Sequence, residues 1–319
     1  MSVIIPTRNR TDKLARCLES VYKSDYGKLE VIVVDDASEN PASGVLSGKF
    51  PNARFIRNSE RMLLSYSRNS GAAASTGDYL FFLDDDNVIA PDTIRLLAET
   101  LGESEGVAVS SPIIFYLSRP ATVWTSYISR SKFPGFYTLH TDIPSKEVAT
   151  FSFHNSFMVK KKVFVALDGF DYANLPIRFG EVDFAHRVSA SGYAAVVNPR
   201  AKDWHDLGWT TVHIDSTRAY YTERNRIIVI KRYFKKRDLT FYLVCILPFI
   251  GGFYLLHHPL STTDGRSKTA SSFLRGIAAG LVFKEPDEAK AREMARGRDG
   301  TARDEKFLKN FKRDSVESF

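Results

Sequence analysis

The sequence predicts an α/β fold with a Rossmann-like, mostly parallel sheet, helices on both faces of that sheet, and a helical C-terminal extension. Strand-like and helix-like segments alternate along the first part of the chain. The strand-like segments are almost continuously apolar, as expected for parallel strands that are covered on both faces. After about residue 215 the chain becomes basic and aromatic at helical spacing. We therefore expect one α/β domain over residues 1–215, with halves 1–110 and 111–215, and an extension over 216–319.

The first two predicted elements are a strand and a helix. Residues 2–10, "SVIIPTRNR", begin with β-branched side chains and predict a short strand that Pro6 stops. Residues 11–24 predict a helix that Thr11 can cap. The buried face of this helix is indicated by apolar residues at helical spacing, namely Leu14, Cys17, Leu18 and Val21.

The next predicted strands end on acidic residues. Residues 29–38, "LEVIVVDDAS", predict a strand that runs into Asp35 and Asp36, and residues 53–58 predict a weaker strand. Residues 65–78 are rich in small side chains and predict a helix that ends at Gly77. The strand predicted for "YLFFL", residues 79–83, is followed at once by Asp84, Asp85 and Asp86. Ligands of open α/β sheets bind at the carboxyl ends of strands, so we expect these carboxylates and Thr7 to converge on one edge.

The second half of the domain is more mixed. Residues 107–116 and 153–161 predict strands, with a loop-like region over 117–150 between them. Residues 181–193 predict a helix whose buried face carries Val182, Ala185 and Val188, and residues 194–199 predict a further strand. Two acidic residues, Glu181 and Asp183, lie in the first turn of that helix.

The C-terminal extension predicts association with a membrane surface. Residues 218–237 form a basic helical pattern, and an apolar run over 239–256 follows, near the lower length limit for crossing a bilayer. Pro248 interrupts this run, and residues 271–283 form a second, shorter amphipathic segment. Basic residues directly before an apolar run favour anionic headgroups on the cytoplasmic side of a membrane. A solvated helix face followed by a buried helical hairpin is the alternative.

Bulk properties agree with a cytoplasmic location. The formal net charge is +7, which suits anionic partners without selecting one. The two cysteines, Cys17 and Cys245, lie far apart, which suits a reducing compartment. No basic stretch followed by a long apolar run opens the sequence, so we expect no signal peptide. Binding to nucleic acid is not expected, because the basic residues flank an apolar run and do not pattern a groove-reading helix.

The acidic residues suit three chemical roles. Carboxylates in series, as at 84–86, are hard oxygen ligands for Mg²⁺ or Mn²⁺. Asp35 and Asp36 could accept hydrogen bonds from a ribose or a base, and Glu181 could act as a general base. His205 could ligate the same metal ion. The alternatives are a solvated turn at 84–86, helix capping at 35–36, first-turn acids that favour the helix dipole, and a satisfied core histidine.

Six segments occur in an order that resembles the family 2 glycosyltransferases, which have the GT-A fold. These segments, spread over about residues 1–235, are "SVIIPTRNR", "VIVVDDAS", "SRNSGAAASTGDYLFFLDDDN", "DGFD", "GEVDFAHRVSASGY" and "RNRIIVIKRYF". The extension more loosely resembles rhamnosyltransferase-like members. The resemblance implies metal-assisted, inverting transfer of a sugar from a nucleotide-diphosphate sugar to a hydroxyl of a lipid-linked or cell-surface glycan.

The resemblance also implies roles for individual residues. Nucleotide-sugar binding would fall to Pro6, Thr7, Arg8, Asp35, Asp36, Arg68, Asn69, Asp84 and Asp85. Metal binding would fall to Asp86, Asp84 and His205, with Mn²⁺ or Mg²⁺ as the cofactor. Glu181 would be the general base and Asp183 a supporting catalytic residue. The chain departs from the family's E-D-x-D pattern here, because Gly180 stands where the first Glu is expected and Glu181 where the Asp base is expected.

Other functions stay open on the sequence. A polyprenyl-phosphate sugar synthase needs no strong base, so an intact Glu181 argues against it. A sugar nucleotidylyltransferase usually has a glycine-rich loop after the first strand, and "PTRNR" has no glycine. A sugar- or nucleotide-binding module that has lost catalysis is the third alternative. The donor nucleotide, its sugar and the acceptor are not readable from the sequence.

Overall fold

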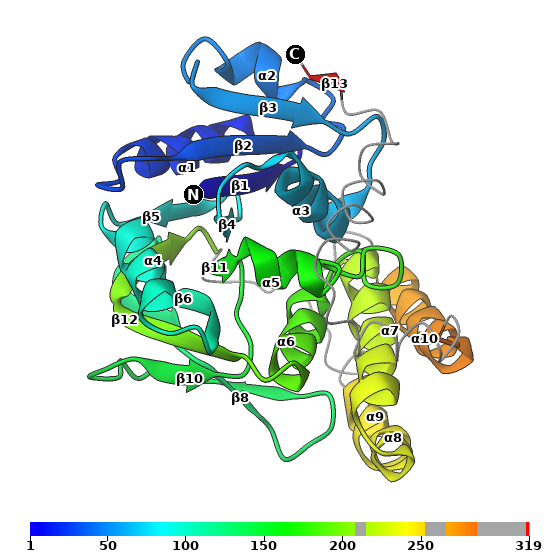
Figure 1. Cartoon of the computed structure of the whole chain (residues 1–319). Coiled ribbons are helices and arrows are strands. Elements are labelled where there is room, and N and C mark those ends of the chain that lie inside the picture. The colour runs from blue at the N-terminus through cyan, green and yellow to red at the C-terminus, as the bar shows by residue number, and fades with distance from the viewer. Residues whose placement is uncertain (208–214, 253–265, 286–316, 319) are drawn as a thin grey trace.

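The computed structural model describes residues 1–207, 215–252, 266–285 and 317–318 (Figure 1). A large mixed sheet forms its centre, with the strand order β10-β12-β6-β11-β4-β1-β2-β3-β13; β5 pairs with β12, and β7 pairs with β6. The strands of this sheet are β1 (Ser2–Thr7), β2 (Glu30–Asp35), β3 (Ala53–Arg57), β4 (Tyr79–Leu83), β5 (Asn87–Ile89), β6 (Val107–Tyr116), β7 (Arg119–Thr125), β10 (Val148–Thr150), β11 (Ser156–Lys160), β12 (Ala194–His205) and β13 (Glu317–Ser318). A separate hairpin is formed by β8 (Ile128–Arg130) and β9 (Tyr137–Leu139).

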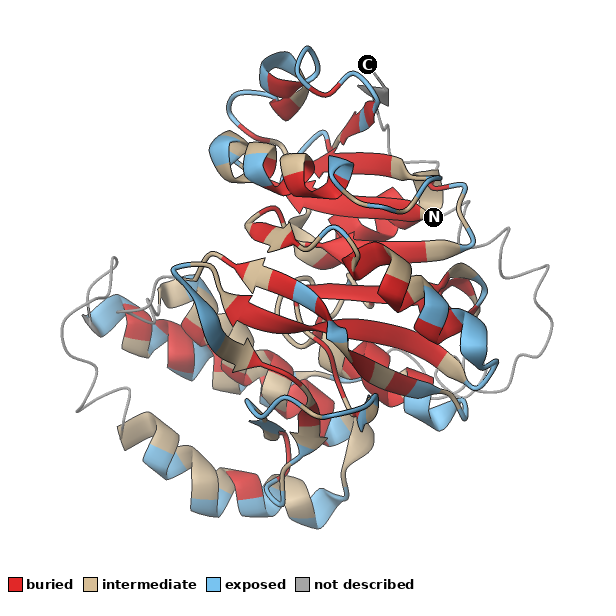
Figure 2. Cartoon of the chain, turned by 90° about the vertical axis from the view of Figure 1, so that its left-hand side faces the viewer, coloured by how far each residue is buried: buried red, intermediate tan, exposed pale blue. Residues whose placement is uncertain are grey.

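The described helices are α1 (Thr11–Tyr22), α2 (Ala42–Leu46), α3 (Leu63–Ala74), α4 (Thr93–Glu103), α5 (Lys161–Ala166), α6 (Gly180–Ala190), α7 (Ser216–Tyr233), α8 (Lys236–Phe241), the π-helical turn η1 (Tyr242–Ile246), α9 (Leu247–Gly252) and α10 (Arg266–Val282). One apolar core packs α1, α2 and α4 against one face of the sheet. A second core packs α3, α5 and α6 against the other face. Figure 2 shows the strands buried between these helices. The prediction of helices on both faces is therefore confirmed.

The parallel pairing of β4, β1, β2 and β3 positions the acidic edge. In the register of β1 and β2, Thr7 lies opposite Asp35. β4 runs parallel to β1 on its other side. The strands therefore end together, and the residues that follow them meet at one edge of the sheet. Beyond β4 the sheet becomes mixed, because β11 runs antiparallel to both β4 and β6 whereas β12 runs parallel to β6.

Three element boundaries differ from the sequence prediction. Pro6 does not stop β1; it lies within the strand, opposite Val34. Pairing of β1 with β4 extends only to Ile4, so Pro6 has a partner strand on one side only. Its missing N–H therefore costs the sheet no backbone hydrogen bond. Thr11 is the first residue of α1 and not its cap, since Arg10 takes the N-cap position without a side-chain hydrogen bond. Helix α3 ends at Ala74, before Gly77.

The region over 117–150 is not simply a loop, as it contains β7, β8, β9 and β10. Three of these strands have only three residues each, and the first four residues of β7 are exposed. Such short and half-exposed strands carry almost no alternating apolar pattern, so they could not be predicted from the sequence. β12 is also longer than the predicted strand over 194–199, because it continues across the sheet to His205.

The C-terminal helices lie together beside α6 (Figure 1). Helices α7 and α10 pack against each other, and Ile227 and Ile230 of α7 form a small core with Tyr242 of η1. Among the helices that the structure describes, none is both long and apolar enough to cross a membrane. Of the apolar run over 239–256, residues 253–256 lie outside the described residues.

Candidate functional site

Asp85 is the buried member of the acidic run that follows β4. Its Oδ2 accepts a hydrogen bond from Thr7 Oγ1 at 2.6 Å, and its Oδ1 lies 2.7 Å from a guanidinium nitrogen of Arg10. Burial raises the pKa of Asp85 to about 7, although Arg10 and Thr7 oppose this shift. The predicted convergence of Thr7 and the acidic run is thus confirmed. Arg10, which we did not single out in the sequence, contributes the neutralising charge.

Arg68 of α3 joins two acidic motifs that lie far apart in the sequence. Its side chain is buried, and its guanidinium donates to Asp84 Oδ1 at 2.9 Å and to Glu181 Oε1 at 2.5 Å. Burial alone raises the pKa of Glu181, but the charge and the hydrogen bond of Arg68 outweigh it and leave this pKa below its usual value. Glu181 is therefore ionised at neutral pH, and its side chain stays 19% exposed.

Asp86 faces the end of β12. Its Oδ1 lies 3.2 Å from His205 Nε2, and its Oδ2 lies 2.9 Å from Arg10 and 3.9 Å from Lys13. Burial works to raise the pKa of Asp86, but the hydrogen bond and charge of His205 outweigh it and lower this pKa. Inside the protein the three carboxyl groups of the acidic run therefore meet Arg68, Arg10 and His205.

The donor set at this edge fits a divalent cation. Carboxylate oxygens of Asp84 and Asp86 with an imidazole nitrogen of His205 suit Mn²⁺ or Mg²⁺. Asp86 and His205 already meet, and Arg10 is 46% exposed at its side chain, so it can leave Asp86. Within the described ranges, however, no three His, Cys, Asp or Glu side chains are gathered as a ready metal site.

Asp35 and Asp36 are occupied by the backbone of neighbouring elements. Asp35 accepts hydrogen bonds from the N–H groups of Ser38 and Ala42, at the start of α2, and pairs with Arg57 at 3.0 Å. Asp36 accepts hydrogen bonds from the N–H groups of Met62 and Leu63, at the start of α3. This geometry favours the capping interpretation, and binding of a ribose or base by these carboxylates stays a prediction.

Three further residues predicted to bind the nucleotide sugar have different settings. Asn69 is buried and exchanges two hydrogen bonds with the backbone of Phe170, so it fixes a loop. Pro6 is part of β1. Arg8 follows β1, and its buried Nε has no hydrogen-bond partner within the described part of the chain. Arg8 therefore keeps an unused donor near the acidic edge.

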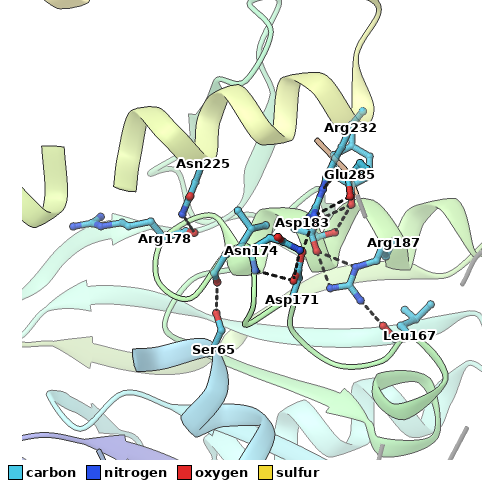
Figure 3. A network of polar contacts seen from close by, with 12 residues as sticks. Ser65, Leu167, Asp171, Asn174, Arg178, Asp183, Arg187, Asn225, Arg232 and Glu285 are labelled. Carbon is cyan, nitrogen blue, oxygen red and sulfur yellow. Dashed lines mark hydrogen bonds and ion pairs between the residues drawn. The ribbon is translucent and has the colours of Figure 1, made fainter. Parts of the chain in front are cut away.

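Asp183 lies apart from Glu181, in an ion network between α6 and α7 (Figure 3). Its carboxylate contacts Arg187 at 2.8 Å, Arg232 at 2.9 Å and the hydroxyl of Tyr233 at 2.7 Å. Its side chain is only 1% exposed. The structure therefore does not bring Asp183 to the acidic edge, and its setting is that of an anchor for α6.

The turn before α6 has an unusual backbone that α7 stabilises. Arg178 and Phe179 both adopt left-handed conformations, with φ of 65° and 61°. Asn225 of α7 donates hydrogen bonds to the carbonyls of Ile177 and Arg178 (Figure 3). Such backbone strain persists where surrounding contacts fix it, and it is frequent at functional sites. The turn delivers Glu181 to Arg68.

Two aromatic residues that sequence reasoning did not place also reach this edge. Trp124 of β7 packs with ring centroids 4.7 Å from His154 and 5.2 Å from His205. His154 also interacts electrostatically with Glu181. His154 lies within the strand predicted over 153–161, where nothing in the apolar pattern singles it out.

Comparisons with known proteins agree with this geometry. A family model described as glycosyl transferase family 2 matches residues 2–165. An uncharacterized glycosyltransferase of Haemophilus influenzae is 34% identical over 107 residues, which cover 34% of this chain and 36% of that protein. A GalNAc(5)-diNAcBac-PP-undecaprenol beta-1,3-glucosyltransferase of Campylobacter jejuni is 27% identical over 107 residues, which cover 32% of this chain and 35% of that protein.

A solved structure shows the same fold. The crystal structure of GalNAc-T7 with UDP, GalNAc and Mn²⁺ matches with a TM-score of 0.60 at 14% identity, over 86% of this chain and 54% of that chain. At that identity the match establishes the GT-A fold alone. The matched part of this chain spans 28%, 36% and 38% of the length of three curated relatives.

Proposed function

This chain belongs to glycosyl transferase family 2, and we propose that it transfers a sugar, with inversion, from a nucleotide-diphosphate sugar to a hydroxyl of a lipid-linked or cell-surface glycan. Its membership makes it a glycosyltransferase. The donor class and the mechanism are the proposal. GalNAc-T7 was solved with UDP and Mn²⁺, and the Campylobacter relative carries a lipid-linked acceptor in its name.

The bridge made by Arg68 is the observation that carries this proposal. Inverting transfer needs a base on one side of the reacting carbon and charge stabilisation for the leaving group on the other. Arg68 connects Glu181, the proposed base, to Asp84, a proposed ligand of the metal ion that would stabilise the leaving group. The two carboxylates belong to separate sequence motifs. A partly exposed, ionised Glu181 beside the acidic edge suits the base.

The residues then divide the reaction between them. Glu181 accepts the proton of the acceptor hydroxyl as that oxygen attacks the anomeric carbon. Arg10, with Lys13 nearby, offers positive charge to the departing diphosphate from the other side. Asp86, Asp84 and His205 would hold the divalent ion. When bound, Mn²⁺ or Mg²⁺ supplies Lewis-acid stabilisation of the charge on the leaving nucleotide.

A location at the inner face of the cell membrane completes the proposal. An acceptor linked to a lipid would reach the enzyme at a membrane surface. The exposed residues Lys235, Lys236 and Arg237, at the start of α8, precede the apolar run that begins at Leu239, which supports attraction to anionic headgroups.

A thermal-shift screen tests the proposed donor class. The purified chain is heated with UDP, GDP, dTDP or CMP, each with and without Mn²⁺ or Mg²⁺. Ligands that bind only the folded state raise the unfolding temperature by mass action. We expect one nucleoside diphosphate to raise it in a metal-dependent way, and Asp86→Ala to remove the metal dependence. Asp25→Ala is the matched control, since Asp25 pairs with Arg95 at an exposed site. No shift with any nucleotide would favour a non-catalytic module.

A further inference from the structure

The partly exposed imidazole of His154, at the acidic edge, has a buried nitrogen without a hydrogen-bond partner in the described part of the chain. This nitrogen is Nε2. Buried polar atoms are normally paired, because an unpaired one loses its hydration without compensation. A ligand group at this position would remove that penalty. Burial lowers the pKa of His154 to about 4, so the ring is neutral at physiological pH.

The imidazole is held in place from two sides. The ring of Trp124 packs against it at 4.7 Å. On the chain itself, the next residue is fixed to the acidic edge, because the carbonyl of Asn155 accepts a hydrogen bond from the N–H of Asp84 at 3.0 Å. The side chain of Asn155 also donates to Asn87 at 2.7 Å. The position of His154 is therefore set before any ligand binds, which reduces the entropy cost of recognition.

The surroundings of His154 include residues to which we assign roles in the reaction. It interacts with Glu181, the proposed base, and with His205, on the side of the leaving diphosphate. In an inverting displacement these two groups act on opposite faces of the anomeric carbon. The ring of Trp124 packs on both His154 and His205, so the imidazole of His154 lies at the same edge of the sheet as the proposed metal ligands, where the sugar of a bound donor would lie.

We propose that His154 is a specificity-determining residue whose Nε2 hydrogen-bonds a hydroxyl of the transferred sugar, with Trp124 holding the imidazole in position. This inference rests on the proposed transfer reaction and deepens it. The partner is a hydroxyl group of the sugar and not the nucleotide, so loss of the imidazole changes sugar recognition and leaves nucleotide recognition intact.

Calorimetry on the full chain with Mn²⁺ measures the relevant quantity. The probes are UDP and GDP, and their conjugates UDP-GlcNAc, UDP-glucose and GDP-mannose. The sugar contribution is the ratio of the Kd for the nucleoside diphosphate to the Kd for its conjugate. We expect His154→Leu to lower this ratio about tenfold while the Kd for UDP or GDP stays unchanged. His154→Gln, which keeps a hydrogen-bonding group, should retain most of the ratio.

A second histidine provides the matched control. His140, which directly follows β9, also stacks on an aromatic ring, that of Tyr127 at 4.1 Å, and its Nε2 hydrogen-bonds Ser129 of β8. His140→Leu should therefore leave the sugar contribution unchanged. An unchanged ratio in His154→Leu overturns the inference while the proposed function stands. A wild-type chain that binds no sugar conjugate of UDP, GDP or dTDP removes the proposed function, and the inference with it.

Ligand analogues give a test that needs no variant to fold. Monodeoxy forms of the conjugate that binds are measured against the wild-type chain. We expect one deoxy position to lose about tenfold in affinity, and the same position to lose nothing further in His154→Ala. If every deoxy analogue binds the wild-type chain as well as its parent, the hydrogen bond to Nε2 does not exist.

Discussion

At the scale of single residues, Arg68 couples the proposed base to the acidic run. Glu181 and Asp84 both depend on its guanidinium, which is 2% exposed at the side chain. A lysine could not replace Arg68, because an ammonium group lacks the planar set of N–H donors with which the guanidinium binds two carboxylates at once. The ionised state of Glu181, which lies on α6, therefore depends on Arg68 of α3.

We predict that Glu181→Gln abolishes most of the transfer while donor binding persists. Glutamine keeps the shape of the side chain but cannot accept the proton, so kcat should fall by about 10²- to 10⁴-fold. Donor Kd should change little, because the proton is transferred only in the chemical step. Initial-rate kinetics and calorimetry on the same preparation check both. Equal kcat in wild type and variant would exclude Glu181 as the base.

Which residues meet at the site was predictable; what each one binds was not. The acidic run and Thr7 converge because parallel strands end at one edge, which follows from the strand pattern alone. The partners depend on loop conformation: Arg10 turns back onto Asp85 and Asp86 from the loop after β1. The resemblance implied that Asp183 supports Glu181, but two residues that are two positions apart on a helix point to different sides.

At the scale of elements, α6 depends on α7. Asp183 on α6 is paired with Arg232 of α7, which also reaches Asp171 at 2.7 Å and Glu285 beyond α10 (Figure 3). The network therefore ties the helix that begins near Glu181 to the C-terminal helices. This coupling was hidden in the sequence, because the two helices lie about 50 residues apart.

We predict that Asp183→Asn lowers the free energy of unfolding by about 3 kcal/mol, because it leaves two buried guanidinium groups without their shared carboxylate. Burial alone raises the pKa of Asp183, but Arg187 and Arg232 outweigh it and hold this pKa low. The stabilisation is therefore full above the unfolded-state pKa, about 3.9, and is lost as pH falls through the lower folded-state pKa. Denaturant unfolding at pH 7 and at about pH 3 measures it.

The matched control is a carboxylate pair at the surface. Glu105 pairs with Lys162 at 2.7 Å, but its side chain is 85% exposed. Glu105→Gln should leave unfolding unchanged at either pH, because solvent screens exposed pairs. If Asp183→Asn is as stable as wild type at pH 7, the network does not anchor α6.

We predict that Gly71→Ala destabilises the packing of α3 on the sheet by about 2 kcal/mol. A Cβ at this position would clash with Ile4 and lie 3.1 Å from the Val34 methyl group. In contrast, a Cβ at Gly44 of α2 would meet nothing within 4 Å. Gly44→Ala should therefore stabilise by about 0.5 kcal/mol through helix propensity. Thermal unfolding of both variants measures these changes in stability. If the two variants changed the unfolding temperature equally, Gly71 would not be a close-packing residue.

The elements themselves were predictable in proportion to their apolar pattern. Strands β1, β2 and β4 and helix α1 have continuous or periodic apolar runs, and the structure has them nearly where the sequence predicts. Helix α4 was not predicted, although it buries Ile94, Leu97 and Leu101 at helical spacing. The short strands after β6 depend on tertiary pairing, which no local pattern encodes.

At the scale of the whole molecule, the C-terminal segment presents apolar side chains to solvent. Phe241, Val244 and Phe249 of the α8–α9 segment are 42%, 68% and 81% exposed. Phe133, from the loop between β8 and β9, stacks on Phe241 with ring centroids 6.4 Å apart and is itself 53% exposed. Exposed apolar groups beside basic ones are a feature of segments that lie in a membrane interface.

We therefore predict that the chain binds vesicles that contain anionic lipid. In a flotation assay at low salt, it should rise with vesicles of phosphatidylcholine and phosphatidylglycerol, and less with phosphatidylcholine alone, because basic residues are attracted to the negative surface. Phe241→Glu with Phe249→Glu should lower the bound fraction about tenfold, since both apolar side chains lose their place in the interface. Val45→Glu is the matched control, because Val45 on α2 is 55% exposed and α2 lies beside β3, at the end of the molecule away from α8 and α9 (Figure 1). A wild-type chain that stays at the bottom of the gradient with every vesicle would refute membrane association. If Val45→Glu lowered the bound fraction as much as the double variant does, exposed apolar residues in general, and not this segment, would drive the binding.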